Sequence, residues 1–236
     1  MIDAGIKGDV LFHTIVGSHL WNCARPDSDV DEFVCYALPT RDILLGKEGM
    51  SFHKPGLVDP ADNKEHDLAI HEAGVIVHQL LKGNPNFLIG VFSNKSLYEP
   101  LENSFGLDDG STTWLSSLRA ALDGNISKNC YNAFKGYGVG HYLKYIESGK
   151  DASERRCNIG VRFFNFGISL LLTGKPDFTP IPKATPDMVF NKFDALQRAY
   201  AISSLPERPE QPKKLEDWLL MVRTRKFMEW FDEWLE

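Results

Sequence analysis

Two stretches decide the fold of this sequence: Val10-Leu11-Phe12-His13-Thr14-Ile15-Val16-Gly17-Ser18 and, after ten further residues, Asp29-Val30-Asp31-Glu32-Phe33-Val34-Cys35-Tyr36. Each contains a short apolar, partly β-branched run, which predicts a buried strand. The first strand ends in a Gly-Ser turn, and the second begins with two aspartates two positions apart. Because side chains alternate along a strand, Asp29 and Asp31 share one face, about 7 Å apart along the backbone.

This pair of carboxylates predicts a site for a divalent cation, since hard oxygen ligands suit Mg²⁺. The Gly17-Ser18 turn supplies the complementary half, because backbone N–H groups can approach a phosphate there and the serine hydroxyl adds a donor. Two cations would need a third carboxylate, for which we expect Asp67 in the strand-like segment 66–70. The alternative for an isolated Asp-x-Asp pair is a solvated strand start.

The chain divides into a strand-containing front part and a helical back part. Strands are predicted at 10–16, 29–38 and 66–70, with a long loop at 47–65. Helices are predicted at 40–46, 73–81, 85–92, 112–122, 127–148, 153–173, 186–202 and 214–235. We therefore expect an α+β fold, in which a small mixed β-sheet core with flanking helices (residues 1–110) precedes a mostly helical C-terminal part packed on it (residues 111–236).

Composition and charge restrict the class of protein further. The 236 residues are 43% hydrophobic and 25% charged, as in globular proteins, and the net charge of −6 excludes a uniformly basic nucleic-acid binder. No apolar run approaches the roughly 18 residues of a membrane helix, and the N-terminus lacks the features of a signal peptide. A cytoplasmic protein without a membrane partner is therefore expected. The four cysteines form no C-x-x-C pair, so no zinc site is predicted.

Beyond these local patterns, the order of strand, Gly-Ser turn, Asp-x-Asp and a later aspartate resembles the nucleotidyltransferase core of the DNA polymerase β superfamily. More narrowly, the runs Gly17-Ser18-His19-Leu20-Trp21, Pro26-Asp27-Ser28-Asp29-Val30-Asp31 and Lys82-Gly83-Asn84-Pro85-Asn86 are similar to the RNA repair pathway DNA polymerase beta family. The resemblance covers residues 10–92 well and residues 127–175 loosely. It implies that residues 1–110 form a nucleotidyltransferase catalytic core.

The resemblance also implies an activity, which is transfer of a nucleoside monophosphate from an NTP to an acceptor hydroxyl, in RNA repair or end addition. Gly17 and Ser18 would hold the phosphates of the NTP, and Asp29 and Asp31 would bind two Mg²⁺ ions, or Mn²⁺ in their place. Asp67 would complete the metal site and help to activate the acceptor. The acceptor is expected to be a nucleic acid, RNA rather than DNA, or a protein. The alternative function is that of a minimal-nucleotidyltransferase-type antitoxin or interaction protein that acts on a partner protein.

Basic residues predict where phosphates bind. Residues 119–175 carry nine basic and four acidic side chains, whereas residues 1–118 carry eight basic and seventeen acidic ones. Arg155 and Arg162 are seven positions apart on one predicted helix and so share a face, while Arg156 points about 100° away. We expect Arg155 and Arg162 to contribute to NTP binding. The alternative is that all three arginines lie on a solvated helix face.

Overall fold

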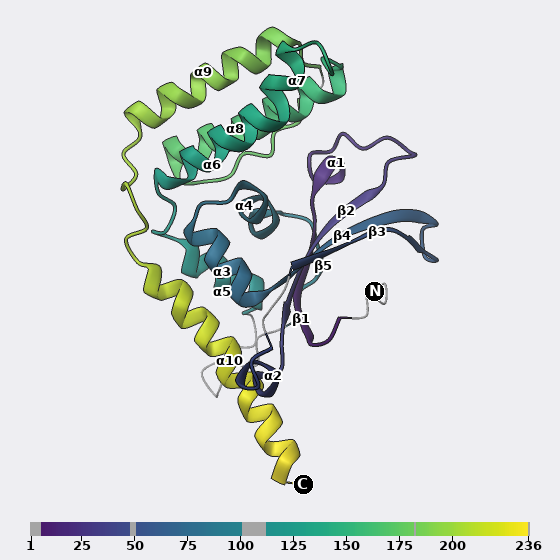
Figure 1. Ribbon diagram of the computed structural model, residues 1–236, viewed down its shortest axis with the longest axis vertical. Helices are drawn as coiled ribbons and strands as arrows, with labels where there is room; N and C mark the ends of the chain where they lie inside the picture. Colours follow the sequence, from purple (N-terminus) through teal and green to yellow (C-terminus); the bar gives the residue numbers. More distant parts are fainter. Residues whose placement is uncertain (1–5, 48–50, 101–111, 182, 236) are drawn as a thin grey trace.

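The computed structural model describes all residues except 1–5, 48–50, 101–111, 182 and 236. Within that part of the chain, one mixed sheet has the strand order β3-β4-β2-β1-β5 (Figure 1). Its strands are β1 (Asp9–Ile15), β2 (Val30–Ala37), β3 (Ser51–Asp59), β4 (Lys64–Glu72) and β5 (Ser96–Tyr98). Strands β2 and β4 are parallel, and the other neighbours are antiparallel.

The helices that follow confirm the α+β fold expected from the sequence. The front part contains α1 (Gly17–Leu20), α2 (Thr40–Leu44), α3 (Ala73–Leu81) and α4 (Pro85–Phe92). The back part contains α5 (Trp114–Leu122), α6 (Asn129–Gly138), the π-helix η1 (Val139–Leu143), α7 (Lys144–Glu147), α8 (Glu154–Thr173), α9 (Pro186–Ile202) and α10 (Pro212–Leu235). The predicted division between residues 110 and 111 falls at a segment outside the described residues and stays a prediction. No described helix is both long and apolar enough to cross a membrane.

The prediction of a long loop at 47–65 is wrong, because residues 51–59 form β3, which pairs with β4 as a hairpin. Two features make this strand difficult to predict from the sequence. Its side chains are mostly exposed, so it lacks a buried apolar face, and Pro55-Gly56 interrupts it. The pairing register shifts between Lys54 and Leu57, which is the kind of bulge that an edge strand tolerates.

The two faces of the sheet bury different clusters. Phe33 on β2 points into the main core, where it packs against Phe87 of α4. Gly90 of α4 lies so close that a β-carbon there would come within 2.5 Å of the Phe33 ring. The opposite face holds a smaller cluster that includes Val34 on β2 and Leu68 on β4. The main core continues through α6, α8 and α9, so the helical part and the sheet share buried side chains.

The last helix returns to the sheet. On α10, Trp218 packs edge-to-face against Trp114 of α5, and Arg223 forms an ion pair with the buried Glu72 at the end of β4. The hydroxyl of Thr40 also donates a hydrogen bond to the Arg223 carbonyl. In Figure 1, α10 accordingly runs beside α5 and α2, away from the paired helices α8 and α9.

Candidate active site

Three carboxylates converge at one end of the sheet, as the sequence predicts. Asp31 on β2 and Asp67 on β4 are directly paired in the parallel register, and Asp29 immediately precedes β2. Each side chain is half-buried and offers an oxygen within 4.8 Å of oxygens from the other two. Alternation along β2 thus places Asp29 on the same face as Asp31, while strand pairing brings Asp67 to it across 36 positions of sequence.

The turn after β1 lies directly against this carboxylate cluster. Gly17 has φ +58°, and a β-carbon at this position would come within 1.8 Å of the Asp31 Oδ2 atom. The Val16 N–H donates to the Asp31 carbonyl at 2.8 Å, which fixes the turn to β2. Next in the chain, the Ser18 hydroxyl and the His19 Nε2 atom are buried without a hydrogen-bond partner among the described residues. The turn therefore combines close approach to Asp31 with polar atoms that are still available to a ligand.

Asp67 is held by a contact that sequence reasoning missed. The Gly56 N–H donates to Asp67 Oδ1 at 2.8 Å. Gly56 has φ +67° and lies at the bulge where β3 shifts its register against β4. A bulge can re-aim backbone groups next to a site, and here it orients one oxygen of the carboxylate. The Pro55-Gly56 pair was the signal in the sequence that could have indicated this bulge. Because residues 47–65 were predicted to form a loop, no pairing strand was assigned to it.

The electrostatics of Asp31 reflect crowding of like charges. Burial, together with the neighbouring charges of Asp29 and Asp67, raises the pKa of Asp31, while His19 and Arg155 act in the opposite direction. Three carboxylates that repel one another are the environment that a bound cation relieves. The donor set, which consists of carboxylate oxygens, matches the chemistry of Mg²⁺ rather than that of a softer metal.

The two arginines expected to bind phosphates have different surroundings. Arg155 is exposed and close enough to Asp31 to influence the pKa of that carboxyl. Arg162 is buried, where it donates to the Asn158 carbonyl and to the Sγ of Cys23. Cys23 in turn contacts the Ser18 carbonyl, so Arg162 lies behind the glycine turn.

Arg156 is already engaged with other groups. Its guanidinium binds Asp151 at 2.8 Å and the His141 carbonyl at 2.8 Å, and it lies over the Tyr145 ring. This side chain therefore points elsewhere on α8, in keeping with the expectation that it differs in direction from Arg155 and Arg162.

The opposite face of β2 carries a second polar cluster that sequence reasoning did not identify. Glu32 is 2% exposed and contacts both His13 on β1 and His66 on β4. Burial alone would raise the pKa of Glu32, but hydrogen bonds and charge from the two histidines outweigh it and lower the pKa. Only the three-strand register brings these residues together, so nothing in the local sequence indicates the cluster.

Asp31 and Asp67 are paired on two parallel strands with a glycine turn beside them, which is the arrangement that the resemblance to the DNA polymerase β superfamily implies. The family comparison agrees: the chain belongs to the RlaP family, the RNA repair pathway DNA polymerase beta family, whose model matches residues 3–153. Among curated proteins, no sequence matches the chain. The family implies nucleotidyltransferase activity in an RNA repair pathway. The match ends before Arg155 and Arg162, so their placement depends on the structure alone.

Proposed function

We propose that this protein transfers a nucleoside monophosphate from an NTP to a hydroxyl of RNA in a Mg²⁺-dependent reaction, for repair or end addition. The observation that carries the proposal is the convergence of Asp29, Asp31 and Asp67 beside the Gly17-Ser18 turn. Membership of an RNA repair family supports RNA as the acceptor.

The residues present fit the metal that this reaction requires. Asp29, Asp31 and Asp67 would hold Mg²⁺, because their oxygens lie within 4.8 Å of one another and their like charges repel. A bound cation would neutralise that repulsion. When bound, the ions neutralise charge on the triphosphate and on the leaving pyrophosphate and make the acceptor hydroxyl more acidic.

The chain itself positions both substrates. Gly17 lets the backbone approach the triphosphate, and the unpartnered Ser18 hydroxyl donates to a phosphate oxygen. As the acceptor oxygen forms its bond to the α-phosphorus, the bond from that phosphorus to the bridging oxygen of the β-phosphate breaks and pyrophosphate leaves. Asp67, whose Oδ1 is held by Gly56, accepts the acceptor proton on its other oxygen. Arg155, beside Asp31, adds positive charge for the triphosphate.

The test is incubation of the full chain with each α-³²P-labelled NTP, Mg²⁺ and, in parallel, single-stranded RNA, single-stranded DNA or a protein acceptor. We expect labelled RNA with at least one NTP, and loss of the label in Asp31→Asn. Asp27→Asn is the matched control, because Asp27 is an exposed loop residue four positions away. Label on protein or DNA alone contradicts RNA as the acceptor, and equal label with both variants contradicts the site.

A further inference from the structure

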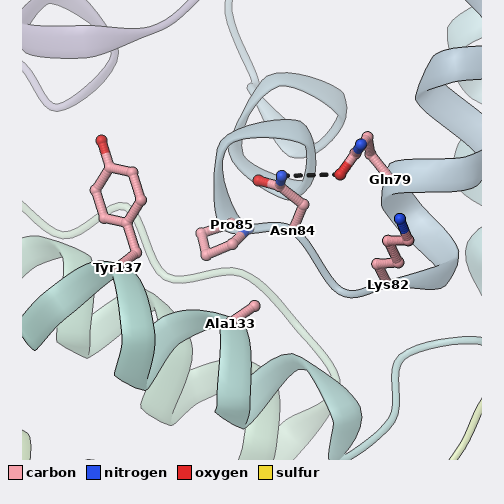
Figure 2. A pocket seen from close by; sticks show the side chains of 6 residues that line it. All are labelled: Gln79, Lys82, Asn84, Pro85, Ala133 and Tyr137. Atoms are coloured by element: carbon pink, nitrogen blue, oxygen red, sulfur yellow. Dashed lines mark hydrogen bonds between the residues drawn. The ribbon is translucent and has the colours of Figure 1, made fainter. Parts of the chain in front are cut away.

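A cavity lies between the end of α3, the α3–α4 turn and α6, and the transfer reaction proposed above does not use it. It has a volume of about 360 Å³ and is lined by Gln79, Lys82, Asn84, Pro85, Ala133 and Tyr137 (Figure 2). Lys82, Asn84 and Pro85 belong to the Lys-Gly-Asn-Pro-Asn run that is distinctive in the sequence. This run therefore forms one wall of a cavity, and α6 forms the other.

Hydrogen bonds determine which way the amides of this wall face. The Asn84 Oδ1 accepts from the Asn86 N–H at 3.1 Å, which caps α4. Because a backbone N–H can only donate, the Asn84 NH₂ group is the one that faces Gln79, and it donates to Gln79 Oε1 at 3.0 Å. The Gln79 carbonyl is thereby occupied, and its NH₂ group, with two donors, is presented outward.

Two other residues of the lining can donate hydrogen bonds, and the Tyr137 hydroxyl can also accept one. Lys82 is exposed and carries a full positive charge, and Tyr137 carries a hydroxyl. Figure 2 shows Lys82 and Gln79 on one side of the cavity and Tyr137 on the other. None of the described residues that line the cavity is acidic. A lysine with neutral donors and no acid recognises an anion.

The cavity is connected to the candidate active site through α8. The Tyr137 ring stacks on Phe163 with centroids 5.0 Å apart. The preceding residue of α8, Arg162, contacts Cys23 beside the glycine turn. Tyr137 also stacks on His141, so its ring is held in place, and its side chain forms a hydrogen bond with that of Tyr142. The cavity lining and the glycine turn therefore both contact α8.

We propose that this cavity binds a backbone phosphate of the single-stranded RNA acceptor, on the strand leading to the reacting end. The inference rests on the proposed function for the identity of the acceptor. Its chemistry follows from the Lys82 ammonium and the Gln79 NH₂ group in the lining, since repeated phosphates are the anions that a nucleic acid presents. Lys82 supplies the charge, and Gln79 supplies a fixed neutral donor.

The test measures binding of a fluorescein-labelled single-stranded RNA to the full chain by anisotropy, without NTP or Mg²⁺. Lys82→Ala removes the charge, and Gln79→Glu replaces the outward NH₂ with oxygen while the carboxylate still accepts from Asn84. We expect each change to raise the Kd by about tenfold, and Lys82→Ala to reduce the salt slope of log Kd by about 0.7. Lys213→Ala and Gln197→Glu are matched controls, because both residues are exposed on other helices.

Several outcomes would overturn the assignment: unchanged Kd in Lys82→Ala and Gln79→Glu, equal weakening in the two controls, or displacement of the RNA by an acidic peptide of equal charge. The last outcome would assign the cavity to a protein partner. Because binding is measured without transfer, the two proposals fail separately. Lys82-dependent binding without label transfer would contradict the proposed function only, and label transfer without Lys82-dependent binding would contradict the cavity only.

Discussion

Asp31 and Glu32 are adjacent on β2 and carry the same chemical group, yet the two faces of the sheet treat them in opposite ways. Asp31 is half-buried among Asp29 and Asp67, and burial together with those charges raises the pKa of Asp31. Glu32 is buried between two histidines, which lower its pKa against the effect of burial. A shift of one residue therefore separates a carboxylate crowded by like charges from one held between two histidines. Asp31 is therefore suited to binding a ligand, whereas Glu32 links β2 to β1 and β4.

The largest expected effect concerns the cluster of Asp29, Asp31 and Asp67. Asp29→Ala removes one oxygen ligand, so we expect kcat/KM to fall by about 10³-fold, or about 4 kcal/mol. The melting temperature should stay the same or rise, because the change relieves carboxylate repulsion. Steady-state transfer assays and thermal melts measure both, with Asp27→Ala as the control. A variant that loses activity only by unfolding would place Asp29 with the structural carboxylates.

For Glu32, which contacts two histidines, we expect a loss of stability instead. Glu32→Ala leaves two buried histidines without their shared partner, so we expect the free energy of unfolding to fall by about 3 kcal/mol, measured by urea denaturation. Asp62→Ala removes an exposed partner of His66, and it should lower the free energy of unfolding much less than Glu32→Ala does. Similar losses in both variants would show that burial does not distinguish these carboxylates.

A substitution at Gly17 tests the position of the Asp31 carboxylate rather than its charge. Gly17→Ala puts a β-carbon against Asp31 Oδ2, and we expect activity to fall by about 10²-fold as the carboxylate moves. Gly46→Ala is the matched control, since Gly46 also has positive φ but has nothing within 4 Å of the added carbon. Both variants should lose about 1–2 kcal/mol of stability, and only Gly17→Ala should lose activity. Activity lost equally in both would assign the effect to backbone strain.

The smallest expected effect concerns a titratable group that has no charged partner among the described residues. Burial lowers the pKa of His71 to about 4, and its ring lies against Phe33 and Phe87. The unfolded chain binds a proton near the ordinary pKa of 6.5 whereas the folded chain does not, so stability falls as pH decreases from about 6.5 toward 4. Allowing for partial exposure, we expect wild type to lose about 1 kcal/mol more than His71→Leu between pH 7 and 5. Denaturant melts at both pH values measure this difference, and equal losses would contradict it.

The sequence predicts those features that depend on local pattern. The D-x-D alternation and the Gly-Ser turn are readable along single strands, and Asp67 follows from an isolated charge in an apolar run. Strand β3 was missed because an exposed edge strand has no buried face to create a pattern, and with it the Gly56 contact to Asp67. The Glu32 cluster was missed because it exists only in the register of three strands. The arginines were placed on the right helix, but packing decides that Arg162 is buried and Arg155 is not.

The return of α10 to the sheet also sets an order for folding. The Thr40 hydroxyl donates a hydrogen bond to the carbonyl of Arg223, which lies 183 positions later in the chain. Glu72 forms its ion pair with the guanidinium of the same residue. During synthesis the sheet is therefore made before Glu72 can pair with Arg223 and before the ring of Trp114 can pack against that of Trp218. Contacts this distant form slowly and late. The front part reaches its final stability only after the last helix has left the ribosome, so a chain stopped within α9 would carry Asp29, Asp31 and Asp67 on a sheet that lacks its contacts with α10.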